Sequence, residues 1–194
     1  MRLLKIFLIR LLTPFVALHE KFWEPWRRIW RHAKAGTRIH IHPSCVLTGP
    51  IHIEGTGAIT IGGKAHFYRD IHLETRQQGE IRLGEGVVIS SGTHVVSFFG
   101  VHIGDKVMIG EFCSIRDANH RMGTGTDYRE SGYQGRPIRI GRNAWLGRGV
   151  CVLPGVEIGA NSIIGANSVV TKSIPDNCLA VGAPARVVKQ GLDS

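Results

Sequence analysis

Aliphatic residues recur at every sixth position between residues 140 and 170, and this period constrains the fold more than any other feature of the chain. The positions are Ile140, Leu146, Val152, Ile158, Ile164 and Val170, and four of them are followed by glycine. A period of six fits neither the 3.6-residue repeat of a helix nor the alternation of a strand meander. It is typical of a hexapeptide solenoid, in which each step lays one short parallel strand on one face of a three-sided coil. We therefore predict that these aliphatic side chains point into a prism.

Small or β-branched residues stand two places before the later members of this run, where a crowded interior would need them. They are Ala144, Val150, Val156, Ser162 and Ser168. Two shorter runs carry the same period upstream: Leu83, Ile89 and Val95, then Ile103, Ile109 and Ile115. The stretch 41–60 alternates without the period, as expected of an irregular terminal coil.

The period breaks briefly at 96–102 and more widely at 121–137, which is polar and rich in glycine. In a solenoid, such an insertion leaves the coil as an external loop, and loops on a rigid frame often carry function. We therefore expect an all-β parallel β-helix over 39–189 with an extruded loop at 121–137. A basic helical arm at 1–38 precedes it, and a short tail at 190–194 follows.

The positive charge is concentrated in the arm. Residues 1–38 hold nine Lys and Arg against Glu20 and Glu24, a net charge of +7 out of +9 for the whole chain. The solenoid is therefore close to neutral, and its charge does not favour a nucleic-acid partner.

The arm reads as an amphipathic helix. Its apolar stretch is interrupted by Lys5, Arg10 and Pro14, and is too short and too charged to span a membrane. No small-x-small cleavage site follows Ala17, so it does not read as a signal peptide. Three tryptophans follow, at positions 23, 26 and 30, interleaved with arginines. Two interpretations stay open: residues 1–34 dock on an anionic membrane surface, or the helix packs on the solenoid end or on a second subunit.

The four cysteines are widely spaced, without a CxxC pair: Cys45, Cys113, Cys151 and Cys178. This pattern favours unpaired structural thiols in a reducing compartment over disulfides. The sequence contains no cluster of zinc-type ligands, so we expect no metal.

The chemistry is predicted where the coil gives way to the large loop, in CSIRDANHR (113–121). His120 is the best candidate for a catalytic group, because an imidazole titrates near neutrality and can take a proton from a hydroxyl and pass it on. Asp117 and Asn119 either orient this ring or bind substrate, or they are ordinary turn residues.

Four segments together resemble a known family: SIRDANHR, GYQGRPIRIGRNAWLG (132–147), VCVLPGVEIGANSIIGANSVVTKSIPDN (150–177) and VGAPARVVK (181–189). The chain is similar to the hexapeptide-repeat acetyltransferases of the maltose/galactoside and xenobiotic type, and within them to the polysaccharide and lipopolysaccharide O-acetyltransferases. The resemblance covers 80–189 well and 40–80 loosely. It implies a left-handed parallel β-helix, a homotrimer with the site between subunits, and acetyl-CoA as co-substrate.

The resemblance also implies residue roles. His120 would deprotonate the acceptor hydroxyl, which then attacks the thioester directly, and Ser90 or Ser91 would bind the acceptor. The donor would be met by Trp145 in the thioester tunnel, by the backbone at Gly147, Gly165 and Ala166 beside pantetheine, and by Lys172, Arg186 and Lys189 at the CoA phosphates. Arg148 departs from the family, in which this position is commonly small.

The residues alone support part of this assignment. Trp145 precedes an inward leucine and should point outward, where a large ring favours a ligand or a subunit contact. The three C-terminal cations suit phosphate, although without the resemblance a solvated surface is the simpler reading.

Other functions fit the sequence less well. A γ-class carbonic anhydrase shares the fold but needs three histidines around zinc, and His120 has no partner in the loop that follows it. A serine acetyltransferase would carry a helical N-terminal domain, which is absent here. An inactive scaffold and an antibiotic acetyltransferase remain as alternatives. We expect an acetyl-CoA-dependent O-acetyltransferase that acts on a sugar hydroxyl of a glycan or of a lipid-linked precursor, in the cytoplasm and at the inner face of the membrane.

Overall fold

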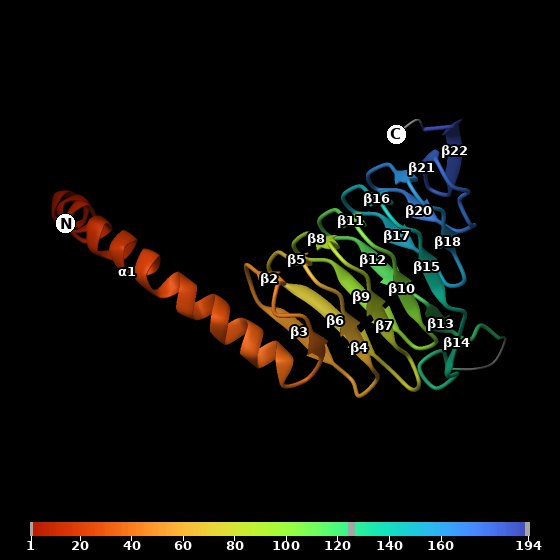
Figure 1. Ribbon diagram of the computed structural model, residues 1–194, viewed down its shortest axis with the longest axis horizontal. Coiled ribbons are helices and arrows are strands. Elements are labelled where there is room, and N and C mark those ends of the chain that lie inside the picture. The colour runs from red at the N-terminus through yellow and green to blue at the C-terminus, as the bar shows by residue number, and fades with distance from the viewer. Residues whose placement is uncertain (1, 124–126, 193–194) are drawn as a thin grey trace.

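The computed structural model describes residues 2–123 and 127–192 of the 194-residue chain. Residue 1 of the expected arm, residues 124–126 of the expected loop and residues 193–194 of the expected tail lie outside the described residues. A long helix, α1 (Arg2–Gly36), leads into a solenoid of short parallel strands, and it extends from the end of the solenoid opposite to β21 and β22 (Figure 1).

Over the described residues, the strands form three parallel sheets that make the three faces of a prism. Sheet A contains β1 (His40–Ile41), β4 (Ile59–Ile61), β7 (Ile81–Leu83), β10 (Val101–Ile103), β15 (Ile138–Ile140) and β18 (Glu157–Ile158). Sheet B contains β2 (Val46–Leu47), β5 (His66–Phe67), β8 (Val88–Ile89), β11 (Met108–Ile109), β16 (Trp145–Leu146), β19 (Ile163–Ile164), β21 (Cys178–Gly182) and the antiparallel β22 (Ala185–Gln190). Sheet C contains β3 (Ile51–Glu54), β6 (Ile71–Thr75), β9 (His94–Ser97), β12 (Ser114–Arg116), β17 (Cys151–Val152) and β20 (Val169–Val170). The chain visits A, B and C in turn, so each coil adds one strand to every face.

The six-residue period builds the core as predicted. All six aliphatic members of the downstream run are at most 2% exposed, and so are the five small residues that precede them. Neighbouring coils lie about 4.8 Å apart, so the interior side chains stack into continuous rows of close-packed contacts. The β-helix expected from the sequence is confirmed. Its last strand, β22, ends at Gln190, one residue beyond the limit of 189 expected for the β-helix.

The outward side chains differ from face to face, because each position on one coil lies in register with its counterpart on the next. Sheet A presents a polar column: Thr60, Arg82, His102, Arg139 and Glu157. Sheet B presents the apolar column: Val88, Met108, Trp145, Ile163 and Leu179, with Lys189 beside Leu179. Sheet C presents the histidine ladder (His52, His72 and His94), followed by Ser114, Cys151 and Val169.

The arm meets the prism only near its C-terminal end and then extends away from the first coil (Figure 1). Arg31 donates Nη1 hydrogen bonds to the carbonyls of Leu47 (3.4 Å) and Thr48 (3.1 Å) and pairs with Glu24 at 3.2 Å. Ala35 is buried against the first coil. The large apolar side chains further out are exposed, among them Phe15, Phe22 and Trp26. No helix among the described residues has a stretch both long and apolar enough to cross a membrane.

The expected external loop is a β-hairpin that leaves the prism after β12. Strand β13 (Ala118–His120) pairs antiparallel with β14 (Tyr133–Gly135), so the excursion begins earlier than the sequence indicated. Its base has a small apolar core of its own, in which Ala118 and Tyr133 pack on Val96 and Phe98. This second core fixes the hairpin against sheet C.

Candidate functional site

His120 ends strand β13 and is exposed, so its imidazole is free to meet a substrate. Its ring lies 4.5 Å from the ring of Tyr133, and Tyr133 in turn lies 4.3 Å from Phe98 (centroid to centroid). The hairpin core therefore holds the backbone and one side of the ring, while the rest faces solvent. A position fixed in this way suits a group that must transfer protons to a bound molecule.

The structure assigns Asp117 to the backbone rather than to the His120 ring. Its fully buried carboxylate accepts hydrogen bonds from the backbone N–H groups of Phe98 (2.7 Å), Phe99 (2.8 Å) and Gly100 (2.7 Å). The hydroxyl of Ser97 donates a fourth, at 3.1 Å. A carboxylate has about four lone-pair sites, so these bonds use its acceptor capacity. Of the roles expected for Asp117, the structure supports that of a turn residue, not ring orientation.

Asn119 lies between these two residues on β13, opposite Gln134 of β14, and it is exposed. Successive side chains on a strand point to opposite faces, so Asn119 projects from the other face of β13 than His120. Its side chain is not part of the hairpin core.

Five of the predicted binding residues line one edge of the prism, where sheet B turns into sheet C. Ser90 and Ser91 are half-buried there on the third coil, and Gly147, Gly165 and Ala166 stand on later coils. Their main-chain bonds join coil to coil, as in Gly147 N to Ile164 O (2.8 Å) and Gly165 N to Ala180 O (2.9 Å). A Cβ on Gly147 would lie 2.8 Å from the backbone nitrogen of Ala166, so this turn requires glycine.

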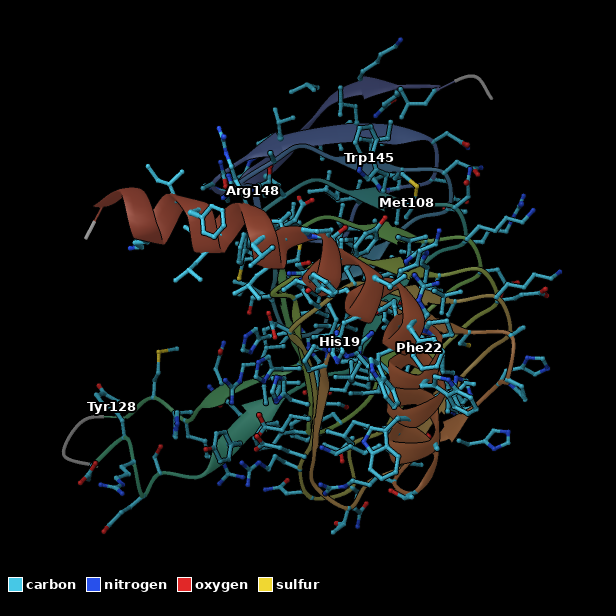
Figure 2. The ribbon with its side chains drawn as sticks, turned by 90° about the vertical axis from the view of Figure 1, so that its left-hand side faces the viewer. His19, Phe22, Met108, Tyr128, Trp145 and Arg148 are labelled. Atoms are coloured by element: carbon cyan, nitrogen blue, oxygen red, sulfur yellow. The ribbon has the colours of Figure 1, made fainter. Side chains whose placement is uncertain are left out.

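Trp145 points outward from sheet B, as predicted, and is 48% exposed. It forms part of a hollow of about 280 Å³ together with Met108, Ile163 and Leu192. Figure 2 labels Trp145 beside Met108 on this face. The apolar column continues from Trp145 through Ile163 and Leu179 to Lys189.

The predicted phosphate-binding cations lie at the C-terminal end of the prism. Arg186 and Lys189 are on β22, opposite Val181 and Leu179 of β21, and Lys172 follows β20. All three are exposed. Lys189 therefore stands about three strand spacings, roughly 14 Å, along the same face from Trp145. An apolar stripe that ends at cations suits a long, thin molecule with a negatively charged end.

One chain does not bring His120 and Trp145 together. His120 stands on the hairpin that leaves sheet C, whereas Trp145 faces outward from sheet B. Figure 2 places Trp145 and Met108 on the opposite side of the view from Tyr128, which lies in the hairpin loop. The sequence predicted both residues but could not place them relative to each other.

Arg148, which departs from the family pattern, caps the ring of Phe112 on the coil before it. Its guanidinium carbon lies 5.4 Å from the ring centroid, within the range of a cation–π contact. The pair stands at the edge where sheet B turns into sheet C.

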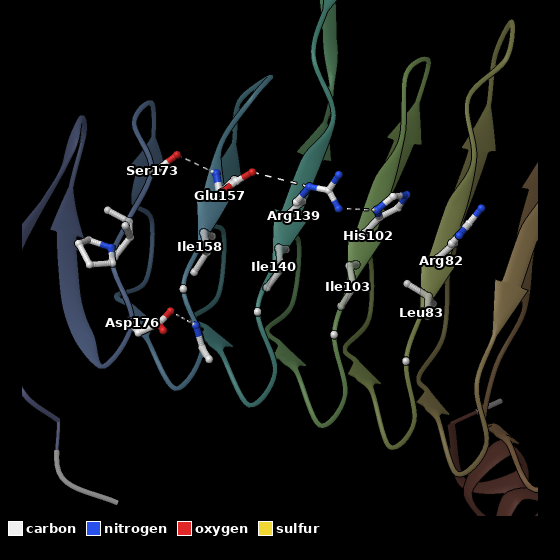
Figure 3. A pocket seen from close by; sticks show the side chains of 17 residues that line it. Arg82, Leu83, His102, Ile103, Arg139, Ile140, Glu157, Ile158, Ser173 and Asp176 are labelled. Carbon is white, nitrogen blue, oxygen red and sulfur yellow. Dashed lines mark hydrogen bonds and ion pairs between the residues drawn. The ribbon is translucent and has the colours of Figure 1, made fainter.

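A hollow of about 860 Å³ forms an open groove along sheet A (Figure 3). In its polar wall, Arg139 bridges two neighbouring side chains: it contacts His102 Nδ1 at 3.2 Å and Glu157 at 3.7 Å. His102 Nε2 lies 2.9 Å from Glu80, and the hydrogen bonds from His102 and Arg82 lower the pKa of that carboxyl. The predicted catalytic and donor-binding residues lie elsewhere, and the groove's own cations are occupied by these ion pairs.

The cysteines are free thiols, as predicted. Burial raises the pKa of Cys113 to about 11, and its thiol donates to the carbonyl of Gly147 (3.2 Å). A thiol in this state is a weak nucleophile, so Cys113 acts as a packing residue.

The histidine ladder was missed by inspection of the sequence. The ladder consists of His52, His72 and His94, which are spaced by 20 and 22 residues, the length of one full coil. Neither spacing is a multiple of six, so the hexapeptide period does not reveal them. Their rings stack on the outside of sheet C, with centroids 4.4 and 4.2 Å apart. The signal that could have found them is a repeat at the spacing of whole coils.

Residues 137–172 match the family model described as bacterial transferase hexapeptide (six repeats). The galactoside O-acetyltransferase of Escherichia coli is 34% identical over 78% of this chain and 72% of its own length. The putative lipopolysaccharide biosynthesis O-acetyl transferase WbbJ of the same organism is 30% identical over 79% of this chain and 83% of its own length. The chain also matches two other acetyltransferases, but it spans only 60% and 55% of the length of those proteins.

Among solved structures, AntD, an N-acyltransferase from Bacillus cereus in complex with dTDP and 3-hydroxybutyryl-CoA, superimposes with a TM-score of 0.69. The match covers 82% of this chain and 87% of that one at 18% identity, so it supports the fold alone. The repeat, the coils that it builds and the similarity to two relatives over most of their length lead to one conclusion: this chain belongs to the hexapeptide-repeat transferase family.

Proposed function

We propose that this protein transfers the acetyl group of acetyl-CoA to a hydroxyl of a sugar, within a surface polysaccharide or a lipid-linked glycan precursor. The observation that carries the proposal is an exposed imidazole, His120, held on a braced hairpin in a chain whose relatives bear the names of sugar O-acetyltransferases. Asn119 and the serines at 90 and 91 are the proposed acceptor contacts.

The proposed reaction is a direct transfer. His120 removes the proton from the acceptor hydroxyl as its oxygen attacks the thioester carbonyl, which becomes tetrahedral. The carbon–sulfur bond then breaks, and the thiolate of CoA takes the proton from the imidazolium. The products are the sugar acetate and free CoA, and the ring returns to its starting state.

The test is release of CoA thiol from acetyl-CoA with a panel of sugars, nucleotide sugars and glycolipid extract, with the acetylated product identified by mass. Acceptor-dependent release with at least one sugar is expected. If the release of CoA thiol never exceeds the rate without acceptor, or if transfer occurs only to amines, the proposed sugar O-acetyltransferase activity is wrong.

The donor is proposed to lie along the apolar column. Pantetheine is long and mainly apolar, and it would run from Trp145 past the edge at Gly147, Gly165 and Ala166. The phosphates would then reach Lys172, Arg186 and Lys189 at the end of the prism. The stripe shares the face of sheet B with Arg186 and Lys189, which supports this path, while Lys172 stands after β20 of sheet C at the same end of the prism.

Replacing Lys172 or Arg186 with alanine is expected to raise the KM for acetyl-CoA by about ten-fold or more, since a hydrogen bond to a charged group contributes about 1.5–3 kcal/mol. Initial rates against acetyl-CoA concentration measure the effect. Lys64→Ala removes an exposed cation on the second coil and is the matched control. If both variants keep the wild-type KM, these cations do not hold the donor phosphates.

The working form is proposed to be a homotrimer with the site shared between neighbours. Support comes from the distance that one chain leaves between His120 and Trp145, and from the exposed apolar column on sheet B. A second copy could cover that column and bring its Trp145 to the His120 of the first.

Mixed assembly of inactive His120→Ala and Trp145→Ala chains should restore activity in about a quarter of the sites if neighbours are shared at random. A mixture as inactive as its parts would place the whole site on one chain.

The arm is proposed to hold the enzyme on the cytoplasmic face of the membrane. One side of α1 carries exposed aliphatic and aromatic residues, and seven cations lie further around the helix between Lys5 and Lys34. An interfacial helix gains from buried apolar area and from anionic lipid, at about 1 kcal/mol per nearby cation. Acetyl-CoA is cytosolic, and lipid-linked glycan precursors present their sugars at that surface.

Removal of residues 1–29 is expected to abolish sedimentation with anionic vesicles, because Arg31 and Ala35, which hold the first coil, remain while the apolar surface is lost. Phe15→Ser with Phe22→Ser should weaken binding strongly, whereas Glu20→Gln on the charged side should not weaken it. If the truncated chain aggregates or changes its oligomeric mass, the arm is a packing element and the docking idea is wrong.

A further inference from the structure

The histidine ladder forms a strip of imidazoles on the outer face of sheet C. His52, His72 and His94 come from β3, β6 and β9 in direct register. Their rings are nearly parallel, at 11° and 8°, and the two outer residues are exposed while His72 is half-buried. The strip therefore runs over the first three coils, along about 10 Å of the prism.

Stacked rings cover one another's faces and leave their edges at the surface. Each neutral imidazole edge carries one N–H donor and one nitrogen acceptor, so the strip repeats a donor and an acceptor at the stacking distance. Burial, then the charges of His94 and His52, lower the pKa of His72. Within the described residues no group of three His, Cys, Asp or Glu could hold a metal.

Carboxylates border the strip. Glu54 and Glu74 stand two residues after His52 and His72 on the same strands and are also in register. Glu74 pairs with Arg76, while Glu54 is exposed. Imidazole edges beside carboxylates form a dense row of hydrogen-bonding groups without a large apolar surface. This chemistry fits the hydroxyl groups of a carbohydrate better than the apolar core of a protein interface.

The strip connects the arm to the catalytic hairpin. At one end, β3 lies on the first coil, against which α1 packs. At the other end, Val96 follows His94 by two residues and is buried beneath the hairpin with Tyr133, which contacts the ring of His120. A molecule lying on the ladder would have one end beside the strand on which the hairpin packs and the other near the arm.

We infer that the histidine ladder binds sugar units next to the one that is acetylated, so that the acceptor is an extended glycan rather than a single sugar. The inference rests on the proposed acetyltransferase activity and names the class of its substrate. The imidazole edges exchange hydrogen bonds with the hydroxyls of successive sugar units, and Glu54 accepts from a further hydroxyl. The free end of the glycan leaves toward the arm, where a lipid carrier would enter the membrane.

The test compares galactose with β-linked galacto-oligosaccharides of increasing length at saturating acetyl-CoA. The wild-type kcat/KM should rise by about ten-fold from the monosaccharide to the trisaccharide, which one or two added hydrogen bonds would give. In His52→Ala and His72→Ala this ratio should fall toward one. His102→Ala, which removes an outward imidazole from sheet A, is the matched control and should keep the wild-type ratio.

A second measurement does not depend on turnover. The ring C–H signals of the three ladder histidines, assigned from the single variants, should shift in NMR spectra when the trisaccharide is added and should not shift with galactose. Transfer to galactose without length dependence and without ring shifts would overturn the ladder site and leave the proposed function standing. Absence of transfer to every sugar would overturn the proposed function and, with it, this inference. A change of oligomeric mass in His72→Ala would assign the ladder to an interface between copies instead.

Discussion

Replacement of His120 by alanine is expected to lower kcat by about two to four orders of magnitude, the usual contribution of a general base. The side chain is exposed and packs along one side against Tyr133, so its loss leaves no cavity in the core. The folded state should therefore be unchanged while the acceptor hydroxyl loses its proton acceptor. Initial rates of CoA thiol release at saturating substrates measure the effect.

Three controls separate chemistry from structure in this experiment. The melting temperature and the affinity for CoA, measured by calorimetry, should match the wild type, because the proposed donor contacts are Trp145, the edge at Gly147 and the C-terminal cations rather than His120. His40→Ala removes an exposed histidine from the first coil and should keep normal rates. Wild-type turnover in His120→Ala would remove the imidazole from the mechanism.

The core of the prism could be predicted because its rule is local. The aliphatic residue of each step points inward regardless of what surrounds it, so the run from Ile140 to Val170 determines six buried positions from a simple count. The outward position of Trp145 follows from the same alternation. The fold class therefore depends on contacts within one coil and on a period that the sequence displays directly.

The surface columns could not be predicted, because they depend on the number of residues in each coil. His52 and His72 are 20 residues apart, whereas His94 follows after 22, since a longer turn precedes β7. The three rings nevertheless stack, as hydrogen bonds between strands set their register. Without the coil lengths, these histidines read as unrelated surface residues.

The two breaks in the period were interpreted separately, yet the structure joins them. The short break at 96–102 contains the backbone N–H groups that donate hydrogen bonds to the Asp117 carboxylate. The long break contains most of the hairpin that begins at Ala118. Proximity in sequence suggested that Asp117 serves His120. In the structure, its carboxylate instead accepts hydrogen bonds from a turn that lies 17 to 20 residues earlier in the chain.

Replacement of Asp117 is therefore expected to cost stability before it costs chemistry. In Asp117→Ala, the N–H groups of Phe98, Phe99 and Gly100 lose their acceptor, and a buried donor without a partner costs about 1–3 kcal/mol. Water can reach the exposed Phe99, so we expect a loss of about 3–5 kcal/mol in the free energy of unfolding, measured by urea denaturation. The kcat should fall as well, because the hairpin that carries His120 loses the turn on which it rests.

Asp117→Asn distinguishes a structural carboxylate from a catalytic one. The amide keeps the shape but turns an N–H₂ group toward a backbone N–H, so about 1–3 kcal/mol of stability should be lost. Asn119→Ala, an exposed change on the same hairpin, should leave the unfolding free energy within about 0.5 kcal/mol of the wild type. A normal unfolding free energy in Asp117→Asn together with a large loss of kcat would return Asp117 to the reaction as a partner of His120. Parallel losses of stability and activity, recovered together at lower temperature, would assign it to the turn.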